Sequence, residues 1–244
     1  MKRTITTILL LGLSFALFTN CGDTGGAGGT KPDNGDKTPP TISSAGASPT
    51  SITLPGEITS VTLTVIATSA DETAIKSIAW TVIDSPTGAN PTIANPSTAS
   101  ATANGMTVAG TYQFRVTVTG NNDVQSTQNV TVIANLDATV DFSTLESGTS
   151  LNFAPIGTLP AGVTYTLTDD KGNSWNSASG FNGQVNASNY SADGPITFTQ
   201  TFYLNGTEIT GTGSKRTVAA SVSAFFGEFM TIASDTGSVT LKYP

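Results

Sequence analysis

The sequence contains no histidine and only one cysteine, Cys21. Histidine is the commonest general base and the commonest metal ligand in proteins. Its absence excludes Ser-His-Asp and Cys-His catalysis, and it excludes zinc sites built from imidazole and thiolate ligands. One cysteine cannot form a disulfide within the chain, so the hydrophobic core alone must stabilise the fold. Any catalysis would have to use carboxylates, lysine, tyrosine or serine, and we expect no cofactor.

Basic residues are also scarce, because ten lysines and arginines stand against 17 acidic residues, for a net charge of −7. Two of the ten, Lys2 and Arg3, lie in a segment that we expect to be removed, which would make the mature chain more acidic still. An acidic surface repels nucleic-acid phosphates and anionic lipid headgroups. We therefore expect no nucleic-acid partner.

The only long apolar run, Ile5–Phe18, is shorter than the roughly 20 residues that cross a bilayer as a helix. Lys2 and Arg3 precede this run, and a positive start followed by a short apolar stretch is typical of a secretory signal peptide. The sequence therefore predicts export from the cytoplasm, with residues 1–20 as the signal peptide.

The end of this segment, Leu17-Phe18-Thr19-Asn20-Cys21, resembles the lipobox of bacterial lipoproteins. The resemblance implies cleavage between Asn20 and Cys21 and attachment of lipid to the Cys21 thiol. Several acyl chains anchor a protein to a membrane far better than one chain does. Gly22 after the cysteine favours the outer membrane and the cell surface, by analogy with enteric bacteria. The alternative is an ordinary cleaved signal peptide with an incidental cysteine.

Residues 21–40 are expected to form the lipidated cysteine and a flexible tether. The segment is rich in glycine and lacks apolar periodicity, so it cannot bury enough surface to order itself. A coil of this length spans about 23 Å r.m.s.. Beyond the tether we expect two domains, 41–134 and 135–244, both built from β-strands.

Alternating apolar and polar residues predict the strands of the first domain, most clearly at 61–68, 75–83 and 112–118. Trp80 and the segment Gly110–Val118 resemble the PKD-type, immunoglobulin-like modules of extracellular proteins. The resemblance implies a two-sheet sandwich in which Trp80 packs in the core and a Gly-x-Tyr segment opens the sixth strand. The alternative for Trp80 is an exposed residue that stacks on a ligand.

The second domain shows similar alternation but resembles no family that we recognise. Asn205-Gly206 predicts a tight hairpin turn that joins 196–204 to 207–210. We expect an all-β fold, either a second β-sandwich or a small barrel, with a helix over 219–230 as a weaker alternative. The remaining strand patterns lie at 163–168, 218–222 and 239–243.

Two groups of oxygen-bearing side chains are candidate calcium sites. Asp169, Asp170 and Asn173 could supply ligands, although the same residues also fit a hairpin turn, which we favour. The second group, Asp71, Glu72 and Asp123, could meet at one end of the first domain, although we favour the interpretation that these residues lie in solvated loops.

Carbohydrate contacts are the other candidate sites. Trp175 and Tyr190 lie near polar, loop-like segments and could stack on sugar rings. A glycosidase would need two carboxylates about 5–10 Å apart, and the sequence brings no particular pair together. The acidic residues considered for such a pair are Asp141, Glu146, Glu208 and Glu228.

These features predict a lipid-anchored protein of the bacterial cell envelope with a non-catalytic role in binding, adhesion or scaffolding. Its partners would be the membrane, through Cys21, and a protein or carbohydrate ligand. The alternatives are a carboxylate-based envelope enzyme that acts on polysaccharide and a bare structural spacer.

Overall fold

The computed structural model describes residues 38–69, 74–146, 148–223 and 229–243. The chain divides into two units, 1–35 and 36–244, and every described residue belongs to the second unit. The expected signal peptide and Cys21 therefore lie outside the described residues. Within the part that the structure describes, no helix is long and apolar enough to span a membrane.

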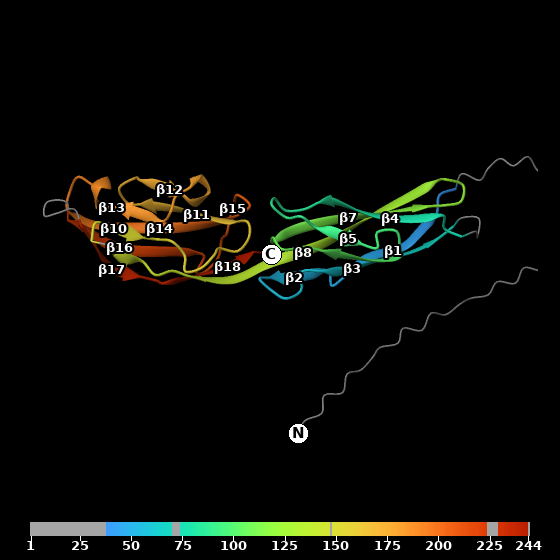
Figure 1. Cartoon of the computed structure of the whole chain (residues 1–244), viewed down its shortest axis with the longest axis horizontal. Helices are drawn as coiled ribbons and strands as arrows, with labels where there is room; N and C mark the ends of the chain where they lie inside the picture. Colours follow the sequence, from blue (N-terminus) through green and yellow to red (C-terminus); the bar gives the residue numbers. More distant parts are fainter. Residues whose placement is uncertain (1–37, 70–73, 147, 224–228, 244) are drawn as a thin grey trace, which may run out of the picture. The chain divides into compact units, whose positions relative to one another are not determined.

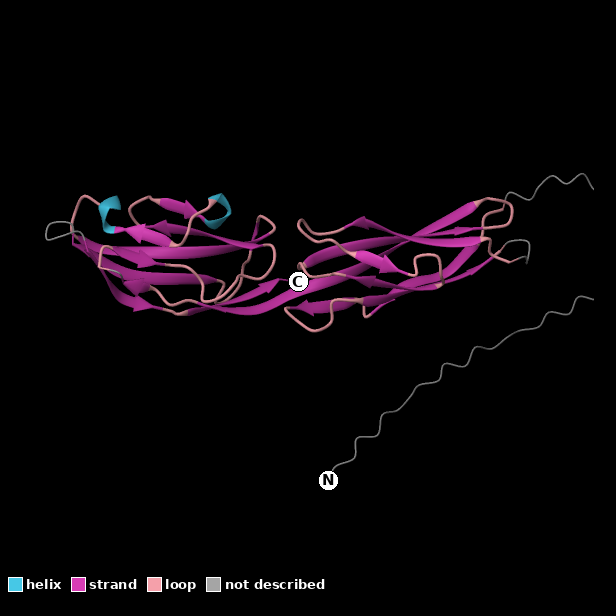
Figure 2. Ribbon diagram, viewed as in Figure 1, coloured by secondary structure: helices cyan, strands magenta, loops and turns pink. Residues whose placement is uncertain are grey.

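Strands make up most of the described residues, and the two helices among them are single 3-10 turns, η1 and η2 (Figure 2). In chain order the elements are β1 Thr41–Ser48, β2 Ser51–Leu54, β3 Val61–Thr68, β4 Ser77–Asp84, β5 Thr92–Ala94, β6 Ser100–Asn104, β7 Gly110–Thr119, β8 Gln125–Asp141, β9 Leu145–Glu146, β10 Ser150–Asn152, β11 Val163–Asp169, β12 Ser174–Asn176, η1 Ser177–Ser179, β13 Gln184–Asn186, η2 Ala187–Asn189, β14 Gly194–Leu204, β15 Thr207–Glu208, β16 Lys215–Ser223, β17 Phe229–Asp235 and β18 Ser238–Tyr243.

Two sheets enclose the first core (Figure 1). One has the order β1-β3-β6-β5, and the other consists of β4, β7 and β8 with β2 beside β8. Strand β18 extends this second sheet along the far half of β8, next to the second sandwich. Alternation places Leu63, Phe114 and Val132 in the interior, because successive side chains of a strand point to opposite faces. Trp80 is only 3% exposed, and its indole Nε1 donates to the carbonyl of Thr98 at 3.1 Å. The prediction that Trp80 packs in the core is confirmed.

Tyr112 fixes the start of strand β7. Its hydroxyl donates to the carbonyl of Val108 at 2.7 Å and accepts the Val108 N–H at 3.2 Å. Burial raises the pKa of Tyr112, and the backbone hydrogen bond to Val108 lowers it by less. A buried tyrosine that bonds back to the backbone a few residues upstream is typical of immunoglobulin-like sandwiches. The expected Gly-x-Tyr opening of this strand is thus present.

The second core lies between a six-stranded sheet and shorter strands. The larger sheet has the order β12-β11-β14-β16-β17, with β15 beside β14, and a three-stranded sheet has the order β13-β10-β9. Leu151, Phe198 and Phe202 are fully buried. These are open sheets with free edges, so of the two expected architectures the structure has the sandwich. The predicted all-β fold class is confirmed.

The hairpin predicted at Asn205-Gly206 is confirmed. Both residues have positive φ, 48° and 84°, and Leu204 pairs with Thr207 across the turn. Positive φ at both central residues is the geometry for which Asn-Gly is favoured. The helix considered over 219–230 is wrong where the structure describes that range, because 219–223 lies in β16 and 229–230 lies in β17.

Strand β8 crosses the expected boundary between residues 134 and 135. Its residues 125–134 pair with β7, and its residues 136–141 pair with β18 in antiparallel register. Strand β2 pairs with it in parallel, from Ser51↔Ile133 to Leu54↔Leu136. The transition between the two sandwiches is therefore a continuous strand rather than a linker.

A buried ion pair lies inside the second sandwich. Arg216 is completely buried, and its guanidinium donates to the Asp235 carboxylate, with Nε 2.8 Å from Oδ1. The other donors reach Gln200 Oε1 and Thr144 Oγ1, and the guanidinium carbon lies 4.7 Å from the centre of the Phe142 ring. Among the described residues, no buried side-chain polar atom lacks a hydrogen-bond partner.

Acid should destabilise this ion pair. Burial raises the pKa of Asp235, but the hydrogen bonds from Arg216, Gly237 and Thr144 lower it by more than burial raises it. The folded pKa therefore lies below its ordinary value. A depressed folded pKa adds stability that is complete above the unfolded pKa, about 3.9, and is lost as the pH falls through the folded value. When denaturant midpoints are measured from pH 7 down to pH 3, the midpoint concentration should therefore decrease once the pH is below about 4.

The variant Asp235→Asn distinguishes the contribution of this carboxylate to the pH dependence of stability from that of other carboxylates that titrate in the same range. The variant should be less stable than the natural chain at pH 7, and the difference should shrink as the pH falls, because only the natural chain loses a paired charge. Parallel stability curves for the two proteins would contradict the assignment.

Candidate functional site

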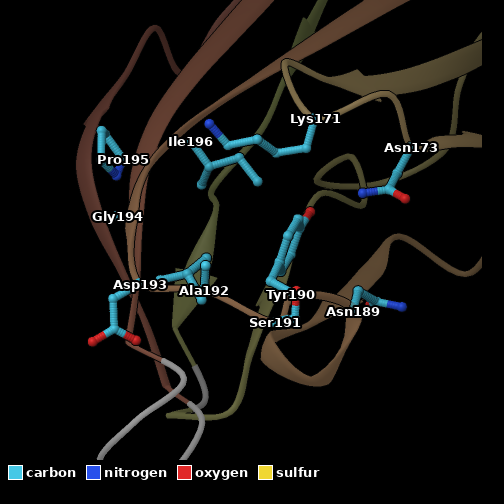
Figure 3. A pocket seen from close by; sticks show the side chains of 11 residues that line it. Lys171, Asn173, Asn189, Tyr190, Ser191, Ala192, Asp193, Gly194, Pro195 and Ile196 are labelled. Carbon is cyan, nitrogen blue, oxygen red and sulfur yellow. The ribbon is translucent and has the colours of Figure 1, made fainter.

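A hollow of about 440 Å³ opens on the second sandwich (Figure 3). Four segments line it: the turn after β11, the end of η2 with the residues that follow it, the start of β14, and Val222 on β16. Its volume falls within the range of about 300–1,000 Å³ that is usual for small-molecule sites. Ile196 and Val222 belong to the lining but are only 1% and 3% exposed, and the other lining residues are mostly polar.

Among the described residues that line the hollow, Tyr190 is the only aromatic one, and hydrogen bonds hold both its hydroxyl and its backbone in place. Its hydroxyl donates to Asp169 Oδ2 at 2.7 Å, and its backbone N–H donates to the carbonyl of Ala187 at 3.0 Å. Burial raises the pKa of Tyr190, and so do the carboxylates of Asp169 and Asp170. The phenol therefore stays protonated at neutral pH and keeps its hydrogen bond to Asp169.

Asp169 organises the turn that follows β11. Its Oδ1 accepts the backbone N–H groups of Lys171 at 2.9 Å and Asn173 at 2.8 Å. Its Oδ2 accepts the Asn173 side-chain amide at 2.8 Å as well as the Tyr190 hydroxyl. Burial raises the pKa of Asp169, yet these hydrogen bonds outweigh burial and the pKa is lowered. Gly172, with φ of 92°, completes the turn.

These contacts bear on the calcium hypothesis for Asp169, Asp170 and Asn173. A carboxylate offers about four lone-pair positions, and four donors already occupy those of Asp169. A cation there would have to displace a hydrogen bond of the turn. Asp170 lies 3.5 Å from the Lys171 ammonium. Across the described ranges, no three acidic residues are grouped as a metal site would require.

The side chains around Tyr190 differ in direction (Figure 3). The Lys171 side chain extends toward Ile196, and the Asn173 amide lies on the hydroxyl side of the Tyr190 ring. Asn189 and Asp193 also line the hollow, but their polar ends point away from the ring. The hollow thus combines one fixed aromatic ring, an ammonium group and an amide.

Trp175 is not among the residues that line the hollow. It lies on β12 opposite Leu167, half-buried, with its ring 6.0 Å from Phe181 and 6.5 Å from Phe198. Part of its surface is therefore already used in packing against the second core. The structure does not bring the two expected stacking residues, Trp175 and Tyr190, into one site.

The other acidic candidates are dispersed. Glu208 lies 3.0 Å from Lys215, and Asp123 forms an ion pair with Lys76. Asp141 is exposed at the end of β8. Asp71, Glu72 and Glu228 lie outside the described residues, and so does the side chain of Glu146.

Sequence reasoning missed Lys171, Ser191 and Ile196 as parts of one site. Ile196 belongs to a strand pattern, and Lys171 and Ser191 belong to loops, so no shared motif links them in the sequence. Only the pairing of β14 with β11 and with β16 brings their segments together.

Comparison with known proteins gives a match for the first sandwich. Residues 45–134 match the family model described as K319L-like, PKD domain. No curated protein matches the chain. The solution structure of the PKD domain from KIAA 1837 protein is 30% identical, with 35% of this chain and 78% of that chain covered and a TM-score of 0.28. The PKD domain of human KIAA0319 is 23% identical, with 44% and 93% covered and a TM-score of 0.33.

Proposed function

We propose, from the premise that residues 45–134 form a PKD domain, that the protein is a lipid-anchored envelope protein with a non-catalytic binding or adhesion role. PKD-like domains are surface or adhesion-type binding modules and are typically non-catalytic. That domain is the observation that carries the proposal. A fold alone does not establish a function, and the second sandwich is the part that would confer a particular ligand.

The anchoring part of the proposal rests on the sequence. Residues 1–20 would be removed as a signal peptide, Cys21 would carry the lipid, and residues up to about 40 would form the tether. The anchor would hold two domains, 41–134 and 135–244, at the outer membrane, where a protein or carbohydrate ligand could reach them. An exported chain with a single cysteine also fits, because acylation of Cys21 would leave no free thiol.

Mass spectrometry of the purified protein tests the anchor directly. The expected mature N-terminus is Cys21 with an added lipid mass, and Cys21→Ser should abolish that mass. Protease treatment of intact cells should cleave the natural chain, as expected for surface display. An unmodified Cys21 would overturn the lipid anchor, and full resistance to protease on intact cells would overturn surface display.

A further inference from the structure

We propose that the hollow beside Tyr190 in the second sandwich binds an uncharged saccharide, which stacks on the Tyr190 ring and hydrogen-bonds to the surrounding polar groups. The inference deepens the proposed binding function by naming a site and a ligand class, and to that extent it rests on that function.

The first argument is the fixed ring. Aromatic faces contribute to binding when their orientation is set beforehand, because little conformational freedom is then lost. Tyr190 is anchored through Asp169, which is itself held by the backbone of its turn. The ring borders the hollow, and Ile196 belongs to the same lining (Figure 3). An apolar ring face of this kind suits the C–H surface of a pyranose.

The second argument is the charge around the hollow. Asp169 and Asp170 place negative charge near the hydroxyl end of Tyr190, which disfavours an anionic ligand. Lys171 extends its ammonium along the lining, which disfavours a cationic ligand. Opposite charges so close together therefore favour a ligand without net charge.

The third argument is the mixture of donors and acceptors. The Lys171 ammonium has three donors, and Asp170 accepts only one of them at 3.5 Å. Asn173 contributes an amide and Ser191 a hydroxyl to the lining. A sugar hydroxyl donates and accepts at once, so vicinal hydroxyls can bond to both kinds of group. The volume of about 440 Å³ suits a mono- or disaccharide, or the end of a longer chain.

The test uses the purified full-length chain in detergent and a panel of disaccharides. The panel contains neutral gluco-, galacto-, manno- and xylo-configured sugars, N,N′-diacetylchitobiose, and one anionic member, digalacturonate. Saturation-transfer NMR should detect at least one neutral sugar, with the strongest transfer to its ring C–H protons. Isothermal titration then gives the dissociation constant.

Three variants and one control test whether the sugar binds in the hollow. Tyr190→Ala should weaken binding by about tenfold or more, and Tyr190→Phe, which keeps the ring, should weaken it less. Lys171→Gln changes an exposed side chain and should weaken binding by about threefold without affecting the fold. Tyr203→Ala is the matched control, since Tyr203 lies on β14 outside the hollow, and it should bind like the natural chain.

Three results would overturn the proposal. The first is that no neutral sugar binds, and the second is that digalacturonate alone binds. The third is that Lys171→Gln and a correctly folded Tyr190→Ala both bind with the affinity of the natural chain. Because this measurement is made in solution, its failure would leave the envelope proposal standing. An unmodified Cys21 would end the anchoring proposal and leave the saccharide site untouched.

Discussion

Replacing Arg216 with alanine is expected to lower the free energy of unfolding by about 3–5 kcal/mol, which is the usual effect of removing one partner from a buried ion pair. The guanidinium is completely buried and serves three side chains, Asp235, Gln200 and Thr144. Its loss would leave the Asp235 carboxylate and the Gln200 carbonyl without their strongest donor. Urea denaturation followed by circular dichroism measures the effect.

Lys215→Ala is the matched control, because it removes a basic side chain one residue away on the same strand. Lys215 is half exposed and lies 3.0 Å from Glu208, so its loss should cost no more than about 1 kcal/mol. If Arg216→Ala were as mild as the control, the buried network would not be the stabilising element described above.

Replacing Trp80 with alanine should cost about 3–5 kcal/mol in the first sandwich. The indole is 3% exposed, so its removal leaves a cavity, and the carbonyl of Thr98 loses the Nε1 donor. Trp80→Phe keeps an aromatic ring and loses the hydrogen bond, so an intermediate loss is expected. Denaturant unfolding of the three proteins gives the order.

Trp175 provides the control for this experiment. It is half-buried on β12, so Trp175→Ala should cost clearly less than Trp80→Ala. Equal losses at the two positions would contradict the account in which burial sets the cost of each substitution.

The strands with regular alternation could be predicted from the sequence. Val61, Leu63 and Val65 lie inward on β3, and Tyr112, Phe114 and Val116 lie inward on β7, as alternation requires. Strands β5, β10 and β13 have only three residues each, too few to show a period, and they depend on their neighbours for pairing. Their positions could not be predicted from local sequence.

The buried network was missed because alternation was read for apolar residues only. Gln200 interrupts the apolar face of β14, and Arg216 occupies an inward position of β16. The register places Gln200 directly opposite Arg216 on neighbouring strands, and both side chains point inward. That two such polar residues compensate each other can be recognised only when the strand pairing is known, and the sequence does not reveal that pairing.

The site was predictable only in part. Asp169–Asn173 was expected to be a turn and Tyr190 a sugar-stacking residue, but nothing in the sequence linked them. Their contact, the hydrogen bond from the Tyr190 hydroxyl to Asp169, joins positions 21 residues apart. It depends on how the segment containing η1 and η2 folds back toward β11, which is a matter of tertiary structure.

The pairing of β8 with β18 has a consequence for the order of events during folding. Residues 136–141 of β8 meet their antiparallel partner only when residues 238–243 arrive, about a hundred positions later along the chain. Contacts between such distant segments form slowly. Until residues 238–243 are in place, this half of β8 lacks its antiparallel partner, so we expect it to be completed late in folding.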